Sequence, residues 1–361
     1  MKKFTPFLLL ICLWGVLALP LTISAQSDTE CPLTDGVLNI AWIPKALDNA
    51  VFELGRVGAE TRAEELTAED LPCDVEVFVA APMNTDATEQ ADLLMEVIDT
   101  GEFDAIAVSC ITPDACFEAL NRATAEGIAA MTWDSDSPDS DRFTYYGTDN
   151  TIAGAAAADL LIRAMGETGK IGILSGVATS QNLNARVQGF ADGIENYPNV
   201  EIVSILYGND DGILSADLIE EFLSATPDVT GIFFAGLWPF TLGRGAMPTW
   251  EEQTLEGRLV NIAFDTLPLE LVLVNEGLVQ GLVGQKYWDW GYGSVSILYD
   301  AIINDVEFES FTDTGFDIVT INNVEAALQA WESNDFTQPL PDPFMDANAI
   351  DATPEATEAS S

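Results

Sequence analysis

The sequence predicts an α/β fold that contains two parallel β-sheets, each covered by helices on both faces. Short β-rich runs alternate with segments of helical periodicity along most of the chain, which is the pattern of repeated β-α-β units. The runs are apolar almost throughout, as expected for parallel strands that are buried on both faces. Ten strands are many for one sheet in a chain of 361 residues, so two similar sheets fit better. The runs are VLNIAWI, VEVFVAA, DAIAVS, IAAMTW, IGILSG, EIVSILY, GIFFAG, LVNIAFD, LVQGLVG and FDIVTIN.

The helical segments carry their own start and stop signals. In TPDACFEALNRATAEG, Thr112 is placed to cap the helix, Pro113 occupies its first position, and Gly127 follows its end. A boundary between the two halves is expected near FTYYGTDNTIAG, where the first four β-α units end and a helix rich in small residues begins. The tail, residues 335–361, is acidic and rich in Pro, Ala and Thr, and we expect disorder from about Ala349.

The first 25 residues have the organisation of a secretory signal peptide. Lys2 and Lys3 form a charged start, an apolar run extends over residues 7–19, and small residues precede a cleavage site that we place after Ala25. An uncleaved membrane anchor is the alternative, but the run is short for a membrane span and is broken by Pro20. We therefore expect an exported protein, either periplasmic or secreted.

The charge of the chain excludes two classes of partner. Thirteen Lys and Arg residues stand against 59 Asp and Glu residues, which gives a formal net charge of −46. A field of this sign repels nucleic acid and anionic lipid surfaces, so neither is expected to bind.

Four cysteines remain after the signal peptide, and export makes disulfides possible. They are Cys31, Cys73, Cys110 and Cys116, for which three pairings are possible. Cys31 and Cys73 each precede a strand, and neighbouring parallel strands bring their starts together, so we expect this pair. Cys110 and Cys116 then flank a short turn between a strand and a helix. Metal ligation is the weaker alternative, since the chain contains no histidine and no CxxC motif.

Polar and aromatic residues recur where the predicted strands end. In open α/β sheets, ligands bind beyond the carboxyl ends of the strands. Asp134 follows the fourth run, Trp238 follows GIFFAG, Asp265 ends LVNIAFD, and Gln285 follows LVQGLVG. Carboxylates and amides hydrogen-bond hydroxyl groups, while aromatic faces cover the C–H faces of a sugar ring. The sequence therefore predicts a site that recognises a small polyol.

Each of these residues also has a purely structural interpretation. Asp134 and Asp265 could cap helices or order turns, although their matching positions favour ligand contact. Trp133 is either a core residue or an aromatic platform for a ligand. Arg186 is either a cation of the pocket or a structural partner for a nearby acid, and we favour the structural role.

Several stretches in their order along the chain identify a family resemblance. The chain resembles the periplasmic sugar-binding proteins of ABC importers, of the ribose-binding type. The stretches are IPKALDNAVFELGRVGAE, PMNTDATEQ, MTWDSDSPDSDRF, YYGTDNTIAG, QNLNARVQGF, NIAFDTLP and GLVGQKYWDWGYGSV. The resemblance implies two Rossmann-like lobes joined by a hinge of three crossings, with the ligand held between them. We expect the N-terminal lobe to contain residues 32–146 plus 286–315, and the C-terminal lobe to contain residues 147–285 plus 316–334.

The resemblance also assigns a set of ligand-binding positions. Those of the general family fall on Asn49, Phe52, Asp134, Asn184, Asp265 and Gln285. Likeness to the subset that binds deoxy sugars or autoinducer-2 adds Lys45, Asp136 and Gln181. Two departures argue against ribose and autoinducer-2 as ligands. Ser180 replaces an acid of the autoinducer binders, and Leu237 followed by Trp238 replaces an asparagine of the ribose binders.

The function expected from these features is capture of a monosaccharide or similar polyol and its delivery to the permease subunits of an ABC transporter. We expect a monomer that needs no cofactor or metal. A ligand-presenting sensor is the first alternative, because it would use the same site. A glycosidase with paired carboxylates such as Asp134 and Asp265 is the second. The absence of histidine and of a GxSxG motif argues against an enzyme.

Overall fold

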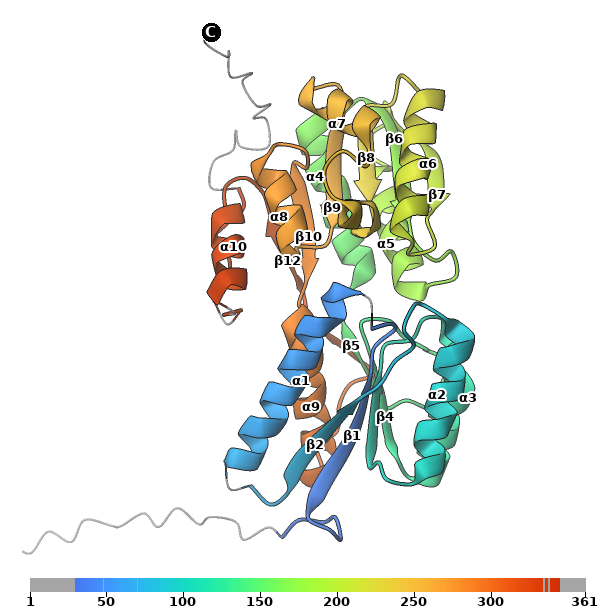
Figure 1. Ribbon diagram of the computed structural model, residues 1–361, viewed down its shortest axis with the longest axis vertical. Coiled ribbons are helices and arrows are strands. Elements are labelled where there is room, and N and C mark those ends of the chain that lie inside the picture. The colour runs from blue at the N-terminus through green and yellow to red at the C-terminus, as the bar shows by residue number, and fades with distance from the viewer. Residues whose placement is uncertain (1–29, 48, 70, 334, 337, 345–361) are drawn as a thin grey trace, which may run out of the picture.

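The computed structural model describes residues 30–47, 49–69, 71–333, 335–336 and 338–344. In this part of the chain, the strands form two six-stranded sheets, each in its own lobe, and the lobes are stacked along the long axis of the molecule (Figure 1). The predicted fold class is confirmed. The predicted signal peptide and the predicted disordered end of the tail lie outside the described residues.

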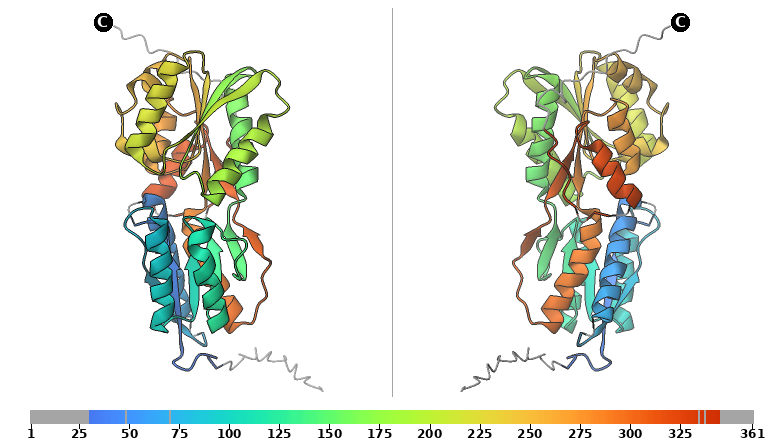
Figure 2. Two further views of the ribbon diagram at one scale, coloured as in Figure 1. Left: turned by 90° about the vertical axis from the view of Figure 1, so that its right-hand side faces the viewer. Right: turned by 90° about the vertical axis from the view of Figure 1, so that its left-hand side faces the viewer.

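The N-terminal sheet has the strand order β11-β5-β4-β3-β1-β2, and all of its neighbouring strands are parallel. Its strands are β1 (Val37–Ile43), β2 (Asp74–Val79), β3 (Ala105–Val108), β4 (Ala129–Trp133), β5 (Thr144–Gly147) and β11 (Phe311–Asp313). One face is covered by α1 (Ala50–Ala68) and α9 (Tyr287–Ile303), and the other by α2 (Ala87–Thr100) and α3 (Pro113–Glu126) (Figures 1 and 2).

The C-terminal sheet has the order β12-β10-β9-β8-β6-β7, in which only β12 is antiparallel to its described neighbour. Its strands are β6 (Gly169–Ser175), β7 (Val200–Tyr207), β8 (Gly231–Phe234), β9 (Val260–Phe264), β10 (Gly281–Gln285) and β12 (Phe316–Val319). The helices α4 (Asn150–Met165) and α5 (Gln181–Ile194) pack on one face. The other face carries α6 (Gly212–Ala225), the 3-10 helix η1 (Trp238–Leu242), α7 (Pro248–Leu255), α8 (Pro268–Asn275) and α10 (Val324–Ser333).

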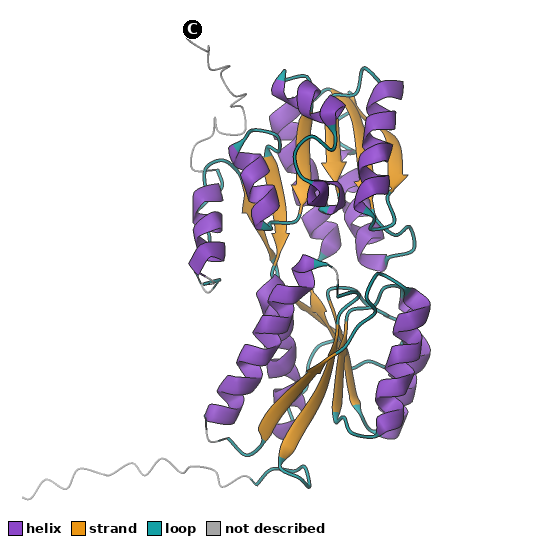
Figure 3. Cartoon of the chain, viewed as in Figure 1, coloured by secondary structure: helices purple, strands orange, loops and turns teal. Residues whose placement is uncertain are grey.

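All ten predicted runs contain a strand, and the structure adds β5 and β11 (Figure 3). Both added strands are short, and their side chains are mostly half-buried or exposed, so they lack the apolar run that marks the others. The predicted cap of α3 is confirmed: the Thr112 hydroxyl accepts a hydrogen bond from the backbone N–H of Ala115. Gly127 ends the helix with a φ of 87°, a left-handed conformation that glycine adopts without steric cost.

The chain passes between the two sheets three times within the described residues. It crosses from β5 to α4, from β10 to α9, and from β11 to β12. Because the strands of both sheets run toward the junction of the lobes, most of their carboxyl ends face each other across it (Figure 3). Parallel sheets bind ligands at this end, so the topology places the loops that follow the strands around one shared cleft.

In each lobe one pair of helices packs backbone against backbone at glycine. A Cβ atom on Gly154 of α4 would lie 2.0 Å from the carbonyl oxygen of Arg186 in α5. A Cβ atom on Gly58 of α1 would lie 2.1 Å from the carbonyl oxygen of Trp288 in α9. Any larger residue at these positions would therefore have to push the two helices apart.

Two further features fix the ends of the described chain. Cys31 and Cys73 form the expected disulfide, which joins the segments that precede β1 and β2. The first part of the tail packs on the C-terminal lobe, where the side chains of Thr320 and Asn322 donate hydrogen bonds to the carbonyl oxygen of Pro343 at 2.8 and 3.0 Å.

Candidate functional site

A cavity lies where the carboxyl ends of the two sheets face each other, and both lobes contribute to its walls. The space between the walls is about 490 Å³, including the part that is open to solvent. Of the ten predicted ligand-binding residues, those that line this cavity are Lys45, Asn49, Phe52, Asp134, Trp238, Asp265 and Gln285.

Asp265 and Gln285, which follow β9 and end β10, form one wall of the cavity in the C-terminal lobe. The Oδ1 atom of Asp265 accepts hydrogen bonds from Gln285 Nε2 at 3.1 Å and from the Tyr287 hydroxyl at 3.0 Å. Its Oδ2 atom accepts none from the described residues, and the buried Gln285 Oε1 atom has no partner among them. A buried acceptor without a partner costs about 1–3 kcal/mol, so Gln285 Oε1 suits a ligand that brings a hydroxyl donor, and the free Asp265 Oδ2 atom can accept a second one.

A second buried carboxyl group, Glu270, lies behind this wall and does not itself line the cavity. Glu270 accepts hydrogen bonds from the backbone N–H groups of Asp265 at 2.9 Å and Leu267 at 3.1 Å. Burial, and then repulsion from Asp265, raise the pKa of Glu270 well above its ordinary value. Burial also raises the pKa of Asp265, against the opposing effect of the nearby Arg186 cation.

Arg186 is a buried cation that belongs both to the structure of the C-terminal lobe and to the cavity wall. Its guanidinium group donates to Asn150 Oδ1 at 2.8 and 3.1 Å and to the carbonyl oxygen of Ala235 at 2.6 Å. It also stacks over the ring of Phe264 at 3.8 Å from the centroid. Burial lowers the pKa of Arg186, and the carboxylate of Asp265 opposes this effect. Arg186 therefore has a structural role, but its hydrogen-bond partners are an amide and a backbone carbonyl rather than the expected acid, and it also lines the cavity.

Asp134 lies at the centre of a polar network that joins the two lobes. Its Oδ2 atom accepts a hydrogen bond from the Ser109 hydroxyl at 2.6 Å and lies 3.3 Å from Lys45 Nζ. Its Oδ1 atom accepts from Asn182 Nδ2 of the C-terminal lobe at 3.3 Å, and Lys45 donates to Asn182 Oδ1 at 3.4 Å. These contacts connect the loops after β1 and β4 directly to the first turn of α5.

The tryptophan before Asp134 is a core residue. Trp133 is fully buried and stacks on Trp42, with ring centroids 4.2 Å apart and an interplanar angle of 11°. The aromatic side chains that line the cavity are Phe52 and Trp290 from the N-terminal lobe and Trp238 from the C-terminal lobe. Trp290 was not predicted because it lies on α9 rather than at a strand end, and nothing in the sequence separates it from the other buried residues of this helix.

The other three predicted residues do not line the cavity. Asp136 forms a buried ion pair with Arg142 at 2.5 Å. Gln181 begins α5, and Asn184 is exposed and donates to the carbonyl oxygen of Ala178. The cavity is lined instead by Asn182 and Arg186, which are four residues apart on the same helix and therefore share a face. A ligand role for Gln181 and Asn184 stays a prediction, whereas the position of Asp136 outside the cavity and its pairing with Arg142 argue against such a role for it.

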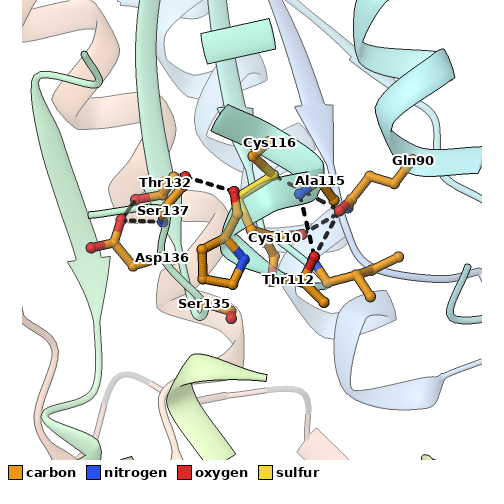
Figure 4. The surroundings of a disulfide bond; sticks show 12 residues. Gln90, Cys110, Thr112, Ala115, Cys116, Thr132, Ser135, Asp136 and Ser137 are labelled. Carbon is orange, nitrogen blue, oxygen red and sulfur yellow. Dashed lines mark hydrogen bonds between the residues drawn. A yellow bond between two sulfur atoms is a disulfide. The ribbon is translucent and has the colours of Figure 1, made fainter. Parts of the chain in front are cut away.

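The Cys110–Cys116 disulfide lies beside the loop that contains Ser135 and Asp136 (Figure 4), and this loop directly follows Asp134. The backbone N–H of Cys110 donates to the carbonyl oxygen of Ser135 at 3.0 Å. The buried side-chain amide of Gln90 donates a hydrogen bond to the carbonyl oxygen of Ser109 at 2.9 Å and accepts one from the backbone N–H of Ile111 at 2.8 Å. The disulfide and this side chain therefore hold the backbone next to the network that joins the lobes.

The chemistry of the cavity wall is that of a site for a neutral polar ligand. Carboxylates, amides and two cations alternate with aromatic rings, and the cations are already hydrogen-bonded to the protein. Among the described residues, no group of three or more His, Cys, Asp or Glu side chains could hold a metal ion.

Comparison with known proteins assigns the family. A family model for the periplasmic binding protein domain matches residues 40–305. The chain belongs to this family. The resemblance predicted from the sequence is thereby confirmed, and the relatives of this periplasmic binding protein are named as binding proteins of importers rather than as enzymes.

Two curated relatives and one solved structure show how far the similarity extends. The periplasmic binding protein is 27% identical to the D-apiose import binding protein of Actinobacillus succinogenes over 54% of its own length and 60% of that relative's length. It is 22% identical to the ribose import binding protein RbsB of Escherichia coli over 76% and 86% of the two chains. A solute-binding protein of an ABC transporter from Burkholderia graminis, solved in complex with D-arabinose, superimposes with a TM-score of 0.71 at 29% identity, covering 79% and 96%.

None of the helices described for this periplasmic binding protein combines the length and the apolar character that a membrane crossing requires.

Proposed function

We propose that this protein captures a monosaccharide or similar small polyol between its two lobes and delivers it to an ABC transporter. The proposal rests mainly on Gln285, whose buried Oε1 atom has no partner among the described residues, and on Asp265, whose Oδ2 atom is free; both residues line a cavity shared by the two lobes. Hydroxyl groups of a sugar would supply the missing donors, and Phe52, Trp238 and Trp290 would cover its apolar faces. The relatives named as D-apiose and ribose import binding proteins, and the structure with bound D-arabinose, support the same ligand class.

The lobes would close on the ligand by movement about the three crossings. We propose that the N-terminal lobe contains residues 32–146 and 286–315 and that the C-terminal lobe contains residues 147–285 and 316–334. The membership of β10, β11 and β12 in the two sheets supports these limits, while the pairing of Gly147 at the end of β5 places the first crossing one residue later. The hydrogen bonds of Asn182 to Lys45 and Asp134 would then form only in the closed state, so they would contribute to closure together with the ligand.

The remaining parts of the proposal concern where the protein works. We propose that residues 1–25 direct export and are removed after Ala25, that the mature chain acts outside the cytoplasmic membrane as a monomer, and that the permease subunits are its partners. A sensor that presents the ligand to a receptor would use the same cavity. A glycosidase is less well supported, because the carboxylate of Asp134 is already engaged by Ser109, Lys45 and Asn182.

A binding screen tests the proposal. Purified protein would be examined by native mass spectrometry for a bound small molecule, and by thermal shift and calorimetry against pentoses, hexoses and their alditols. We expect saturable binding of at least one of these compounds with a rise in melting temperature and no turnover. A folded protein that responds to no sugar or polyol would refute the proposed ligand class, and hydrolysis of a glycoside would favour the enzyme.

A further inference from the structure

A second, larger cavity lies at the mouth of the cleft. The space between its walls is about 1020 Å³, including the part open to solvent, roughly twice that of the inner cavity. Polar side chains from both lobes line it, including Asn84 and Thr85 from the loop before α2 and Asn209 and Thr241 from the C-terminal lobe. Among the described residues that line this mouth there is no lysine or arginine.

The mouth adjoins the inner cavity. Asn49 and Thr85 of one lobe, and Asp210, Leu237 and Trp238 of the other, line both spaces. For a ligand held against Asp265 and Gln285, the passage toward the mouth therefore lies between these five residues.

Trp238 can lie along this passage because two neighbouring residues are glycines. A Cβ atom on Gly236 would lie 2.6 Å from the Trp238 ring, and one on Gly176 would lie 2.6 Å from the ring and 1.9 Å from Asp210 Oδ1. Gly176 lies one residue after the end of β6, and Gly236 lies two residues after the end of β8. The edge of the sheet therefore leaves room for the Trp238 ring. An indole in this position gives a sugar ring a flat apolar surface.

The backbone conformation of the mouth is as unusual as that of the inner cavity. The described non-glycine residues with positive φ are Asp134, Asn209, Asp210 and Asp305. Asp134 lines the inner cavity, Asn209 lines the mouth, and Asp210 lines both. Left-handed conformations of non-glycine residues cost energy and concentrate at ligand-binding sites, so the mouth shares this property with the inner site.

We infer that the mouth is a second glycosyl subsite, and that the ligand is a disaccharide or another glycoside whose first sugar unit occupies the inner cavity. This inference rests on the proposed function and narrows it. The second unit packs against Trp238 and hydrogen-bonds to Asn84, Asn209 and Thr241. Carboxylates at Asp210 and Asp211, with no cation among the lining residues, favour a neutral unit over a uronic acid.

The test compares monosaccharides with disaccharides that contain them. Calorimetry on the full mature chain would use glucose, galactose, arabinose and xylose, and neutral disaccharides of these sugars with α and β linkages. The variant Asn84→Trp places a bulky side chain in the mouth without altering a residue of the inner cavity. The variant Asn199→Trp is the matched control, because Asn199 is also exposed but precedes β7 at the opposite end of the sheet.

We expect at least one disaccharide to bind tenfold or more tightly than its component monosaccharide. Asn84→Trp should remove this advantage and leave monosaccharide affinity within about twofold, whereas Asn199→Trp should change neither. Tighter binding of monosaccharides than of every disaccharide, or an equal effect of Asn84→Trp on both, would overturn the second subsite and leave the proposed function intact. Failure of every sugar to bind would instead overturn the proposed function, and the second subsite with it.

Discussion

Replacing Asp265 by Asn should weaken ligand binding far more than the same change at Asp136. Both residues are buried aspartates close after a strand, but only Asp265 lines the cavity. Its Oδ1 atom is occupied by Gln285 and Tyr287, which leaves Oδ2 for a ligand hydroxyl. A hydrogen bond to a charged group contributes about 1.5–3 kcal/mol, so we expect the dissociation constant to rise roughly 10- to 150-fold.

Asp136→Asn provides the matched control. Its carboxylate pairs with Arg142 and accepts from the Thr132 hydroxyl, and these contacts lie outside the cavity. This variant should lose thermal stability but keep its affinity within about twofold. Isothermal titration calorimetry would measure binding by both variants at a temperature where circular dichroism shows them folded. Unchanged affinity in Asp265→Asn, or the same loss in both variants, would refute the assignment of Asp265 to the site.

Three further expectations follow from the contacts of the site. Asn182→Ala removes hydrogen bonds between the lobes, which at roughly 1 kcal/mol should lower the affinity for the ligand about three- to tenfold. Small-angle scattering should show that the ligand-free variant is more open than the wild type. An unchanged scattering profile and an unchanged affinity would contradict the role of Asn182 in closure. Burial raises the pKa of Asp265 above the 3.8 of an exposed aspartate, so the folded state binds its proton more tightly than the unfolded chain does. As pH rises above 3.8 through this raised pKa, the contribution of Asp265 to the free energy of unfolding should fall while affinity rises, because the ligand needs the carboxylate. Calorimetry and thermal unfolding across pH should give both trends, and Asp265→Asn should flatten them; parallel wild-type and variant profiles would argue against this origin. Replacing Cys110 and Cys116 together by Ser should lower the melting temperature by several degrees and weaken ligand binding, because the loop next to Asp134 loses its covalent support. The control variant, in which Cys31 and Cys73 are both replaced by Ser, should lose stability but keep its affinity. Equal losses of affinity in the two double variants would contradict a specific effect of the Cys110–Cys116 disulfide on the binding loop.

The sequence predicted the architecture well because the inner strands of each sheet are buried on both faces. Continuous apolar runs and clear helix signals, such as Thr112 and Gly127, are local features that tertiary contacts did not override. The two strands that were missed, β5 and β11, are held by neighbours rather than by their own apolar residues, and a short half-exposed strand leaves no such signal.

The candidate site was predictable at strand ends and less so on helices. Asp265 and Gln285 are placed by the strands that precede them, so their position follows from the topology. On α5, by contrast, a shift of one residue turns a side chain by about 100°, and the predicted Gln181 lies next to Asn182, which lines the cavity. Whether Trp133 packs in the core or meets a ligand depends on its stack with Trp42, a contact between distant segments that no local pattern encodes.

The close approach of helices at glycine in each lobe separates two properties that evolution can adjust. Helices whose backbones are in contact cannot shift relative to each other, so each lobe should move as a rigid body and the three crossings should account for almost all of the hinge motion. Substitutions in the crossings would then shift how readily the cleft shuts, and hence how tightly any solute is held, while the groups that distinguish one solute from another keep their places. Evolution could in this way change the ligand concentration at which the protein binds while its ligand specificity stays the same.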